Sequence, residues 1–566
     1  MLNGHSSINS RAARFVKSAI AEQVDNGEGK AIEIYGKRKS ILSISPQNYP
    51  SIFNDVIGPV MRGPSSSHCA AAVRIGKIVR DLMGGEIADI LIQFDPDGSL
   101  ATTHESQGSD MGLFSGLLGW DATDERLADS PKEIENAGIN VKTEITSINA
   151  NHPNTYKMIV SNPKERHTIR AISTGGGIIE IIEIDGIKIS IAGDYYETLI
   201  FFKPAKENLE SYLTKNIPAD EIHFFSNETI KLAEIKSQAF LGKEIISELN
   251  SRFDIQSIKE IEPVLPILSF KGVKVPFITC AEMLEYNRDK NLDLWELAIH
   301  YERSRGSITD AEVIQKMTSI IGIMQDAIYA GLAGTEYADR ILGYQSGNFQ
   351  TQMEKSQLIE GGALNQIILY TTALMESKSA MGLIVAAPTA GACGGLPGAC
   401  IGTASVLNCS KEEMARAMLA GGMIGIFIAA HATFAAEVGG CQAECGSGSG
   451  MASAALVTLA GGSTQQAVNA ASMALQNTFG MTCDPVASRV EVPCLGKNVM
   501  AASNALACAN MALAGYDPVI PLDEVIQAMD KVGKMIHSAL RCTARGGLSL
   551  TETSKKIELK LAKKDI

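Results

Sequence analysis

The spacing of apolar residues predicts helices and strands in alternation over the first third of the chain. In residues 69–85, CAAAVRIGKIVRDLMGG, apolar positions recur at the spacing of an amphipathic helix. Residues 88–101, ADILIQFDPDGSLA, predict a strand and a turn. Residues 168–191, rich in isoleucine, predict hairpin strands that turn at Gly175–Gly177 and Asp185-Gly186. We therefore expect an α/β unit here.

A different order of elements follows between residues 197 and 261. Apolar runs and helical stretches succeed one another as strand, helix, strand, strand, helix, strand. This βαββαβ order is the ferredoxin-like pattern, and it resembles the ACT-type domains that regulate amino-acid enzymes. The junction at Phe202-Lys203-Pro204 lacks the Asp and Gly with which such domains hold an effector. We favour a structural or interface role over a regulatory one.

The pattern becomes helical from about Thr279 to the end of the chain. Long helical periods are followed by an Ala/Gly-rich region from Gly361 to Gly515, where small residues allow helix backbones to approach closely. The uncharged run at 418–436 is long enough to suggest a membrane span, and no other run comes as close. Its glycines, His431 and the polar residues after it favour a helix buried inside a large domain.

These changes predict an α+β multidomain protein. We expect an N-terminal extension at 1–50, an α/β domain at 51–193, an ACT-like domain at 194–262, a linker at 263–290 and an all-α catalytic domain at 291–566. The extension reads as a basic helix and a charged strand-like piece. Arg11, Arg14 and Lys17 precede the first acid there, which faintly resembles a mitochondrial transit peptide, but an ordinary helix is favoured.

Charge and cysteine content narrow the choice of partners and compartment. The 566 residues carry a formal net charge of −13, which gives no global attraction to nucleic acid or anionic membranes. Eleven cysteines is an odd number, and the N-terminus has no long apolar core of a signal peptide. We expect a soluble cytoplasmic protein with reduced cysteines, better suited to metal or cluster ligation than to cross-linking.

Three cysteines lie at breaks that contain Gly or Pro, where the backbone can turn side chains inward: Cys441, Cys483 and Cys494. Iron–sulfur clusters are held mainly by cysteine thiolates. However, spacings of 42 and 11 residues match no common ferredoxin run. From the residues alone, buried structural cysteines therefore remain the alternative.

A second candidate site is the run Ser65-Ser66-Ser67-His68. Three hydroxyls after a Gly-Pro turn form a nest of donors suited to a carboxylate, and histidine is the side chain whose pKa suits proton abstraction near neutrality. The alternative is structural, with Ser67 as the N-cap of the following helix. Both roles are compatible, because the cap would hold the histidine in place.

Several motifs closely resemble those of iron–sulfur-dependent L-serine dehydratases. They are PTAGACGGLPG (388–398), GGCQAECGSGSGMA (439–452), TCDPVASRVEVPC (482–494) and RGGLS (545–549), together with MRGPSSSHCAAAVRIG (61–76), which resembles the β-domain motif of that family. The resemblance covers residues 51–190 and 290–550 in the family's order. It implies a fused β and α part, with a [4Fe–4S] cluster held by Cys441, Cys483 and Cys494.

The resemblance also implies a reaction. An iron without a protein thiolate can hold the carboxylate and hydroxyl of serine, while a base removes the α-proton and hydroxide leaves. The aminoacrylate product becomes an imine and then pyruvate and ammonia. We expect His68 to be the base and Ser65, Ser66 and Ser67 to assist it. Expected substrate-binding residues are Thr389, Ala390, Gly391, Asp110 and Arg545.

The chain departs from the family at three places. It has no cysteine after Cys542, where single-chain bacterial relatives end in a fourth ligand, although Cys445 and Cys542 lie near the motifs. Gln107 stands where relatives carry a histidine, and His104 lies three residues earlier. Cys69 replaces a threonine. These departures put the exact substrate in doubt more than the cluster.

Two other functions remain open. A related β-eliminating lyase acting on threonine, cysteine or a modified amino acid would share every motif. A non-catalytic iron–sulfur sensor would explain the departures but not the retained Ser-Ser-Ser-His run. A pyridoxal-phosphate dehydratase fits poorly, because no lysine lies in a recognisable phosphate-binding context. The expected partners are a small amino-acid substrate and a second copy of the chain in a homodimer, not nucleic acid or a membrane.

Overall fold

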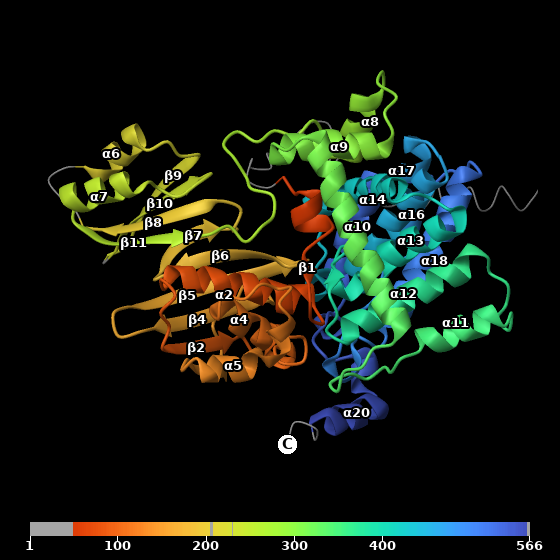
Figure 1. Cartoon of the computed structure of the whole chain (residues 1–566), viewed down its shortest axis with the longest axis horizontal. Coiled ribbons are helices and arrows are strands. Elements are labelled where there is room, and N and C mark those ends of the chain that lie inside the picture. The colour runs from red at the N-terminus through yellow and green to blue at the C-terminus, as the bar shows by residue number, and fades with distance from the viewer. Residues whose placement is uncertain (1–48, 204–207, 229, 563–566) are drawn as a thin grey trace, which may run out of the picture. The chain divides into compact units, whose positions relative to one another are not determined.

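The computed structural model describes residues 49–203, 208–228 and 230–562 (Figure 1). All described residues belong to one compact unit, residues 49–566. The basic helix and strand-like piece predicted for the N-terminal extension lie outside the described residues.

The predicted α/β unit contains a six-stranded sheet in the order β3-β2-β4-β5-β6-β7, in which β2 and β3 are parallel and the other pairs antiparallel. Helices α2 and α4 share one hydrophobic core with the strands, because their apolar faces pack on the sheet. The predicted hairpins are confirmed as β5–β6 and β6–β7. The strands are β2 (Asp89–Phe94), β3 (Asn140–Ile145), β4 (Thr155–Ser161), β5 (Arg166–Gly175), β6 (Ile178–Ile184) and β7 (Ile187–Ile191), and the helices are α2 (Ala71–Leu82), α3 (Leu100–Thr103), α4 (Ser109–Leu117) and α5 (Ser130–Asn136).

Glycines let helices α2 and α4 cross at very short range. A Cβ on Gly116 would lie 2.2 Å from the Val73 carbonyl oxygen and 2.8 Å from the Cα of Gly76. No side chain fits at such distances, so the crossing depends on glycine on both helices.

We expect Gly116→Ala to destabilise the protein by about 1–3 kcal/mol, because the added methyl group overpacks this crossing. Gly322→Ala is the matched control. Gly322 lies inside α10 (Asp310–Ala333), and a Cβ there would meet only the mobile end of Lys411, 3.3 Å away. Alanine should stabilise that helix by about 0.5–1 kcal/mol. Thermal unfolding of the two variants should shift in opposite directions, and equal shifts would contradict the packing argument.

The second predicted unit has the expected element order and a four-stranded sheet, β11-β8-β10-β9, antiparallel throughout. Its two helices contribute to a separate small core with these strands. The elements are β8 (Tyr196–Phe202), α6 (Leu209–Asn216), β9 (Glu221–Ser226), β10 (Lys231–Ser237), α7 (Lys243–Arg252) and β11 (Ile255–Ile261).

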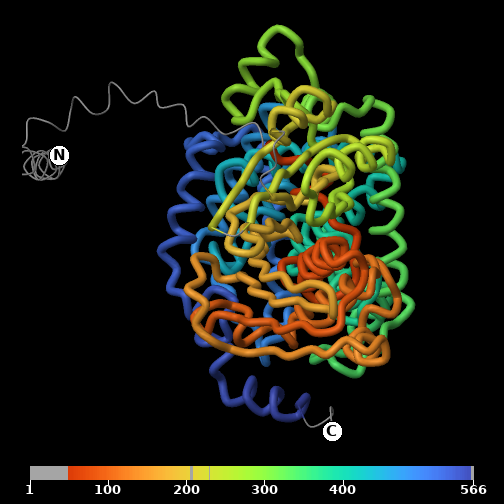
Figure 2. The backbone as a smooth tube through the Cα atoms, turned by 90° about the vertical axis from the view of Figure 1, so that its left-hand side faces the viewer, coloured from red at the N-terminus to blue at the C-terminus, as the bar shows by residue number. Residues whose placement is uncertain are grey.

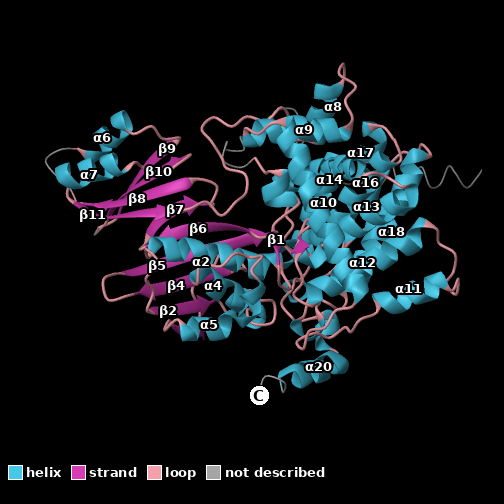
Figure 3. Cartoon of the chain, in the orientation of Figure 1, coloured by secondary structure: helices cyan, strands magenta, loops and turns pink. Residues whose placement is uncertain are grey.

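The C-terminal half is helical, as predicted, and Figure 3 shows the change from strands to helices along the chain. Helices α10, α12, α13, α14, α16, α17 and α18 contribute most of one large core. The last described helix is α20, dark blue in Figure 2. The helices are α8 (Cys280–Asn287), α9 (Leu294–Gly306), α10, α11 (Ser346–Glu354), α12 (Ala363–Ser379), α13 (Gly395–Leu407), α14 (Lys411–His431), α15 (Ala436–Gly439), α16 (Ser447–Leu459), α17 (Thr464–Gln476), α18 (Cys494–Leu513), α19 (Leu522–Met535) and α20 (Glu552–Ala562).

The long apolar run predicted as a buried helix forms most of α14. Residues 411–431 are apolar enough to cross a membrane, but 78% of that stretch is buried inside the protein. A second run, residues 390–407, is slightly shorter and less apolar but passes the same test, and it is 83% buried. The close packing of small residues in this core explains both burials.

A two-stranded sheet joins the start of the described chain to the helical half. Strand β1 (Val60–Met61) pairs with β12 (Ile384–Val385), with Val60 opposite Val385. Each strand leads directly into one of the motifs identified from the sequence, the Ser-Ser-Ser-His run after β1 and the PTAGACG loop after β12. The pairing therefore brings these two motifs together.

Candidate functional site

Four buried thiols form a continuous group, which we call the thiol group: Cys441, Cys445, Cys483 and Cys542. The Cys441 sulfur is within hydrogen-bonding reach of the sulfurs of Cys445 and Cys483, and Cys483 also reaches Cys542. Cys441 and Cys445 lie one turn apart, before α16. Residues 483 and 541 form a parallel bridge, and the Cys542 N–H donates to the Cys483 carbonyl at 3.0 Å.

Cys494 lies beside this group at the start of α18. It acts electrostatically on Cys445 and Cys441, and among the described residues it makes no direct thiol contact. Asn498, one turn further along, holds the helix in place. Its amide donates to the Cys494 and Gly391 carbonyls, and its oxygen accepts from the N–H groups of Gly394 and Gly395.

The donors of the thiol group suit a soft metal or an iron–sulfur cluster. Ligand atoms of Cys441, Cys483 and Glu444 all lie within 4.8 Å of one another. Hydrogen bonds from Cys445 and Cys483 lower the pKa of Cys441 well below its usual value, which favours the thiolate. Amide groups approach the outer sulfurs, Gln107 Nε2 at 3.3 Å from Cys542 and Asn498 Nδ2 at 3.7 Å from Cys445. Such outer donors are typical of thiolate-bound clusters.

The predicted base, His68, lies in a buried π-helical turn, Ser66–Ala70. Ser67 is therefore not the N-cap of α2, as the alternative reading had it, because the turn runs directly into the helix and Ala70 occupies the cap position. Burial, and to a lesser degree His104, lowers the pKa of His68 to about 3. His68 is consequently neutral near pH 7, the form that accepts a proton.

The hydrogen bonds around His68 determine which ring nitrogen is free to accept a proton. Thr103 Oγ1 donates its proton to the Ser99 carbonyl at 2.7 Å, so it accepts from His68 Nε2 at 2.9 Å. Nδ1 then carries the lone pair and accepts from Ser65 Oγ at 3.1 Å. Ser99 also donates to the Cys542 carbonyl at 3.1 Å, which ties the base to the thiol group.

A buried carboxylate forms a second link between His68 and the thiol group. Glu437 Oε1 lies 3.4 Å from His68 Nδ1, and Cys441 follows one turn later in the chain. Burial raises the pKa of Glu437 to about 7. Glu437 was not predicted from the sequence, although a single acid in the apolar run FAAEVGG was a signal, because a buried charge is usually paired or binds a ligand.

The predicted loop Thr389–Gly391 lies against both motifs. The Ala390 N–H donates to Ser66 Oγ at 3.1 Å, and Thr389 Oγ1 donates to Glu444 Oε1 at 2.7 Å. A Cβ on Gly391 would lie 3.0 Å from that same carboxylate. Loop, serine run and thiol group therefore surround one buried region.

Two predicted residues are not brought to this region by any described contact. Asp110 instead pairs with His104, Oδ2 to Nδ1 at 2.7 Å. Arg545 is exposed and donates to the Pro96 carbonyl at 2.6 Å. Arg545 thus contacts the loop after β2 and not the buried region.

Comparison with known proteins gives matches to the N-terminal and to the C-terminal half of the chain. A family model described as serine dehydratase alpha chain matches residues 289–549. "Probable L-serine dehydratase, alpha chain" of Bacillus subtilis is 37% identical over 285 residues, which cover 50% of this chain and 95% of that protein.

The chain belongs to the serine dehydratase family. "Probable L-serine dehydratase, beta chain" of Bacillus subtilis is 40% identical over 152 residues, 27% of this chain and 68% of the relative. "L-serine dehydratase 1" of Escherichia coli is 26% identical over 502 residues, 86% of this chain and 96% of the relative. This serine dehydratase thus joins regions similar to alpha and beta chains in one polypeptide.

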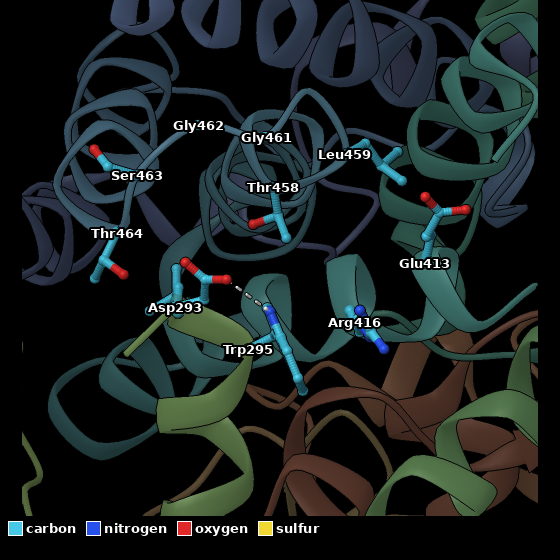
Figure 4. Close-up of a pocket in the computed structure, with 11 residues that line it drawn as sticks. Asp293, Trp295, Glu413, Arg416, Thr458, Leu459, Gly461, Gly462, Ser463 and Thr464 are labelled. Carbon is cyan, nitrogen blue, oxygen red and sulfur yellow. Dashed lines mark hydrogen bonds between the residues drawn. The ribbon is translucent and has the colours of Figure 1, made fainter. Parts of the chain in front are cut away.

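A separate pocket of about 250 Å³ lies among the ends of α9, α14 and α16 (Figure 4). Its polar side chains already have partners, since Arg416 pairs with Glu412 and lies over the Trp295 ring, while Asp293 accepts from the Trp295 indole. None of the predicted site residues lines it. We assign the chemistry of this serine dehydratase to the buried region and not to this pocket.

Proposed function

We propose that this enzyme deaminates L-serine to pyruvate and ammonia, using a [4Fe–4S] cluster held by Cys441, Cys483 and Cys494. The observation that carries the proposal is the junction of the thiol group with His68 through Glu437 and Ser99. A neutral buried base beside cluster-type ligands is the combination that a dehydratase needs, because one removes a proton and the other assists loss of hydroxide.

The cluster would supply a Lewis-acidic iron for the oxygens of the substrate, since three protein thiolates leave one of four irons without a thiolate ligand. The chain's own residues would bind the substrate carboxylate and remove the α-proton. Ser65, Ser66 and Ser67, with the backbone of the Thr389–Gly391 loop, offer donors to the substrate carboxylate. Burial of the whole region excludes water and strengthens each of these hydrogen bonds.

His68 Nδ1 is the atom to which we assign the α-proton. Its lone pair faces Ser65 Oγ, and a substrate carboxylate that takes over the serine hydroxyl would leave that lone pair free. Nε2 remains bonded to Thr103, which keeps the ring oriented while Nδ1 gains a proton. The resulting imidazolium would lie beside the Glu437 carboxylate, which stabilises the positive charge.

The remaining assignments follow from the family and from the fold. We propose that the βαββαβ unit is an ACT-like domain with a structural or interface role, that the enzyme acts in the cytoplasm and that it forms a homodimer. The domain limits are those given above, with residues 51–193 as the β-type domain and 291–566 as the catalytic domain.

The test is an amino-acid panel assayed on enzyme purified without oxygen. L-serine should give pyruvate and ammonia in equal amounts, with threonine and cysteine reacting more slowly. Activity should decay in air and return with ferrous iron and a thiol reductant, because an iron without a thiolate is the one most easily lost. Full activity after removal of all iron by a chelator would contradict the proposal, and a preference for another amino acid would redirect it to a related lyase.

A further inference from the structure

One carboxylate in the buried region has an oxygen with no partner. The Glu437 side chain is 3% exposed, and its Oε2 atom makes no hydrogen bond among the described residues. Asn154 lies beside it, fully buried, and its amide contact with Glu437 lowers the pKa of that carboxyl, although the contact falls outside ordinary hydrogen-bond geometry and leaves the Asn154 oxygen without a partner in the described structure. Burying polar groups without hydrogen bonds raises the free energy of the folded protein. A bound ligand that supplies the missing hydrogen bonds would remove this penalty.

The chemistry of the pair specifies that ligand. A carboxylate and an amide carbonyl are acceptors, and they suit a cation with several N–H donors. The neighbouring groups are of the opposite kind, since the serine hydroxyls and loop N–H groups donate. The other buried carboxylate, Glu444, is already engaged by the Thr389 hydroxyl at 2.7 Å. Glu437 is therefore the acceptor available to an ammonium group.

We propose that Glu437 Oε2 and the Asn154 carbonyl oxygen bind the α-ammonium group of the amino-acid substrate. This assignment rests on the proposed function and deepens it, because it names the group that selects amino acids. The ammonium nitrogen and the α-hydrogen share one carbon. Since Glu437 Oε1 lies 3.4 Å from His68 Nδ1, an ammonium group on Oε2 would place the α-hydrogen next to the base.

A consequence is discrimination between 2-amino acids and 2-hydroxy acids. L-glycerate has the carboxylate and the 3-hydroxyl of serine, but a hydroxyl replaces its ammonium group. It would bring no positive charge to Glu437, so it would lack the charge-assisted hydrogen bonds that an ammonium group donates to the carboxylate. The enzyme should therefore bind serine in preference to glycerate, and the preference should depend on Glu437.

The experiment compares the KM for L-serine with the inhibition constant of L-glycerate in wild-type and Glu437→Gln enzymes. The variant keeps the shape of the side chain and removes its charge. We expect the KM for serine to rise about 10- to 100-fold, the range of a charge-assisted hydrogen bond, while the glycerate constant changes less than about threefold. Glu437→Asp, which restores the charge, should recover part of the preference. The visible absorption of the cluster should be unchanged in both variants.

Glu234→Gln is the matched control, because Glu234 is also a buried carboxylate but belongs to strand β10 of the other sheet, where its Oε1 lies 3.9 Å from Lys236 Nζ. It should leave both constants unchanged. A wild-type KM for serine in Glu437→Gln, or a parallel loss of serine and glycerate binding, would overturn the ammonium assignment alone. A wild-type enzyme that forms no pyruvate from any amino acid would overturn the proposed function, and the assignment with it.

Discussion

Replacing Cys441 or Cys483 by alanine should abolish assembly of the cluster, and with it all turnover. Both sulfurs lie at the centre of the thiol group, where each contacts two other thiols. With Cys441, Cys483 and Cys494 as the three proposed ligands, removing one leaves two ligand thiolates, too few to hold four irons. Iron and acid-labile sulfide should fall from about four of each per chain to a small fraction after anaerobic reconstitution, and Cys494→Ala should behave alike.

Other cysteines provide the controls. Cys400 is fully buried in α13 and outside the thiol group, so Cys400→Ala should keep its iron. Cys445→Ser and Cys542→Ser remove thiols that contact the group, and we expect both to retain the full cluster with an unchanged spectrum. Full iron content in a Cys441, Cys483 or Cys494 variant would remove that residue from the ligand set. Loss of iron in the Cys542 variant would identify a fourth thiolate.

His68→Ala should lower kcat by about two to four orders of magnitude, the usual contribution of a general base, while the iron content stays at its wild-type level. The reason is that the lone pair of His68 Nδ1, which faces Ser65 Oγ, is the proposed acceptor of the α-proton. Exchange of the serine α-hydrogen with deuterated solvent should fall in parallel, which separates proton abstraction from later steps.

His223→Ala is the control for the histidine change. His223 is 42% exposed on β9, where it pairs with Glu221, and its loss should leave kcat unchanged. Undiminished hydrogen exchange in His68→Ala would show that another group removes the α-proton. His104 would be the next candidate, because Asp110 holds its Nδ1 and raises its basicity.

The sequence was sufficient for most of the described secondary structure, and it singled out most of the residues that the structure brings to the buried region. Isoleucine-rich alternation predicted the strands β5, β6 and β7, because a sheet with one buried face imposes that period. Family motifs pointed to the serine run, the Thr389–Gly391 loop and the cysteines, which the structure brings to one region.

Residues whose role depends on tertiary contact were not predictable. Asn154 and Glu437 come from opposite halves of the chain, and nothing local marks them as neighbours. The place of Cys542 depends on a parallel bridge between residues 483 and 541, a long-range pairing without a sequence period. Ser67 was misread as a cap because a π-helical turn has no distinctive sequence pattern.

The central claim is that serine reaches an iron of a cluster held beside His68. A Mössbauer spectrum of enzyme enriched in ⁵⁷Fe, recorded with and without L-serine, tests it most directly. The account predicts a [4Fe–4S] signal in which about one iron of four changes its parameters when serine is added, and does not change with glycine, which lacks the hydroxyl. A spectrum without a four-iron cluster, or one that serine leaves unaltered at every iron, would contradict the account.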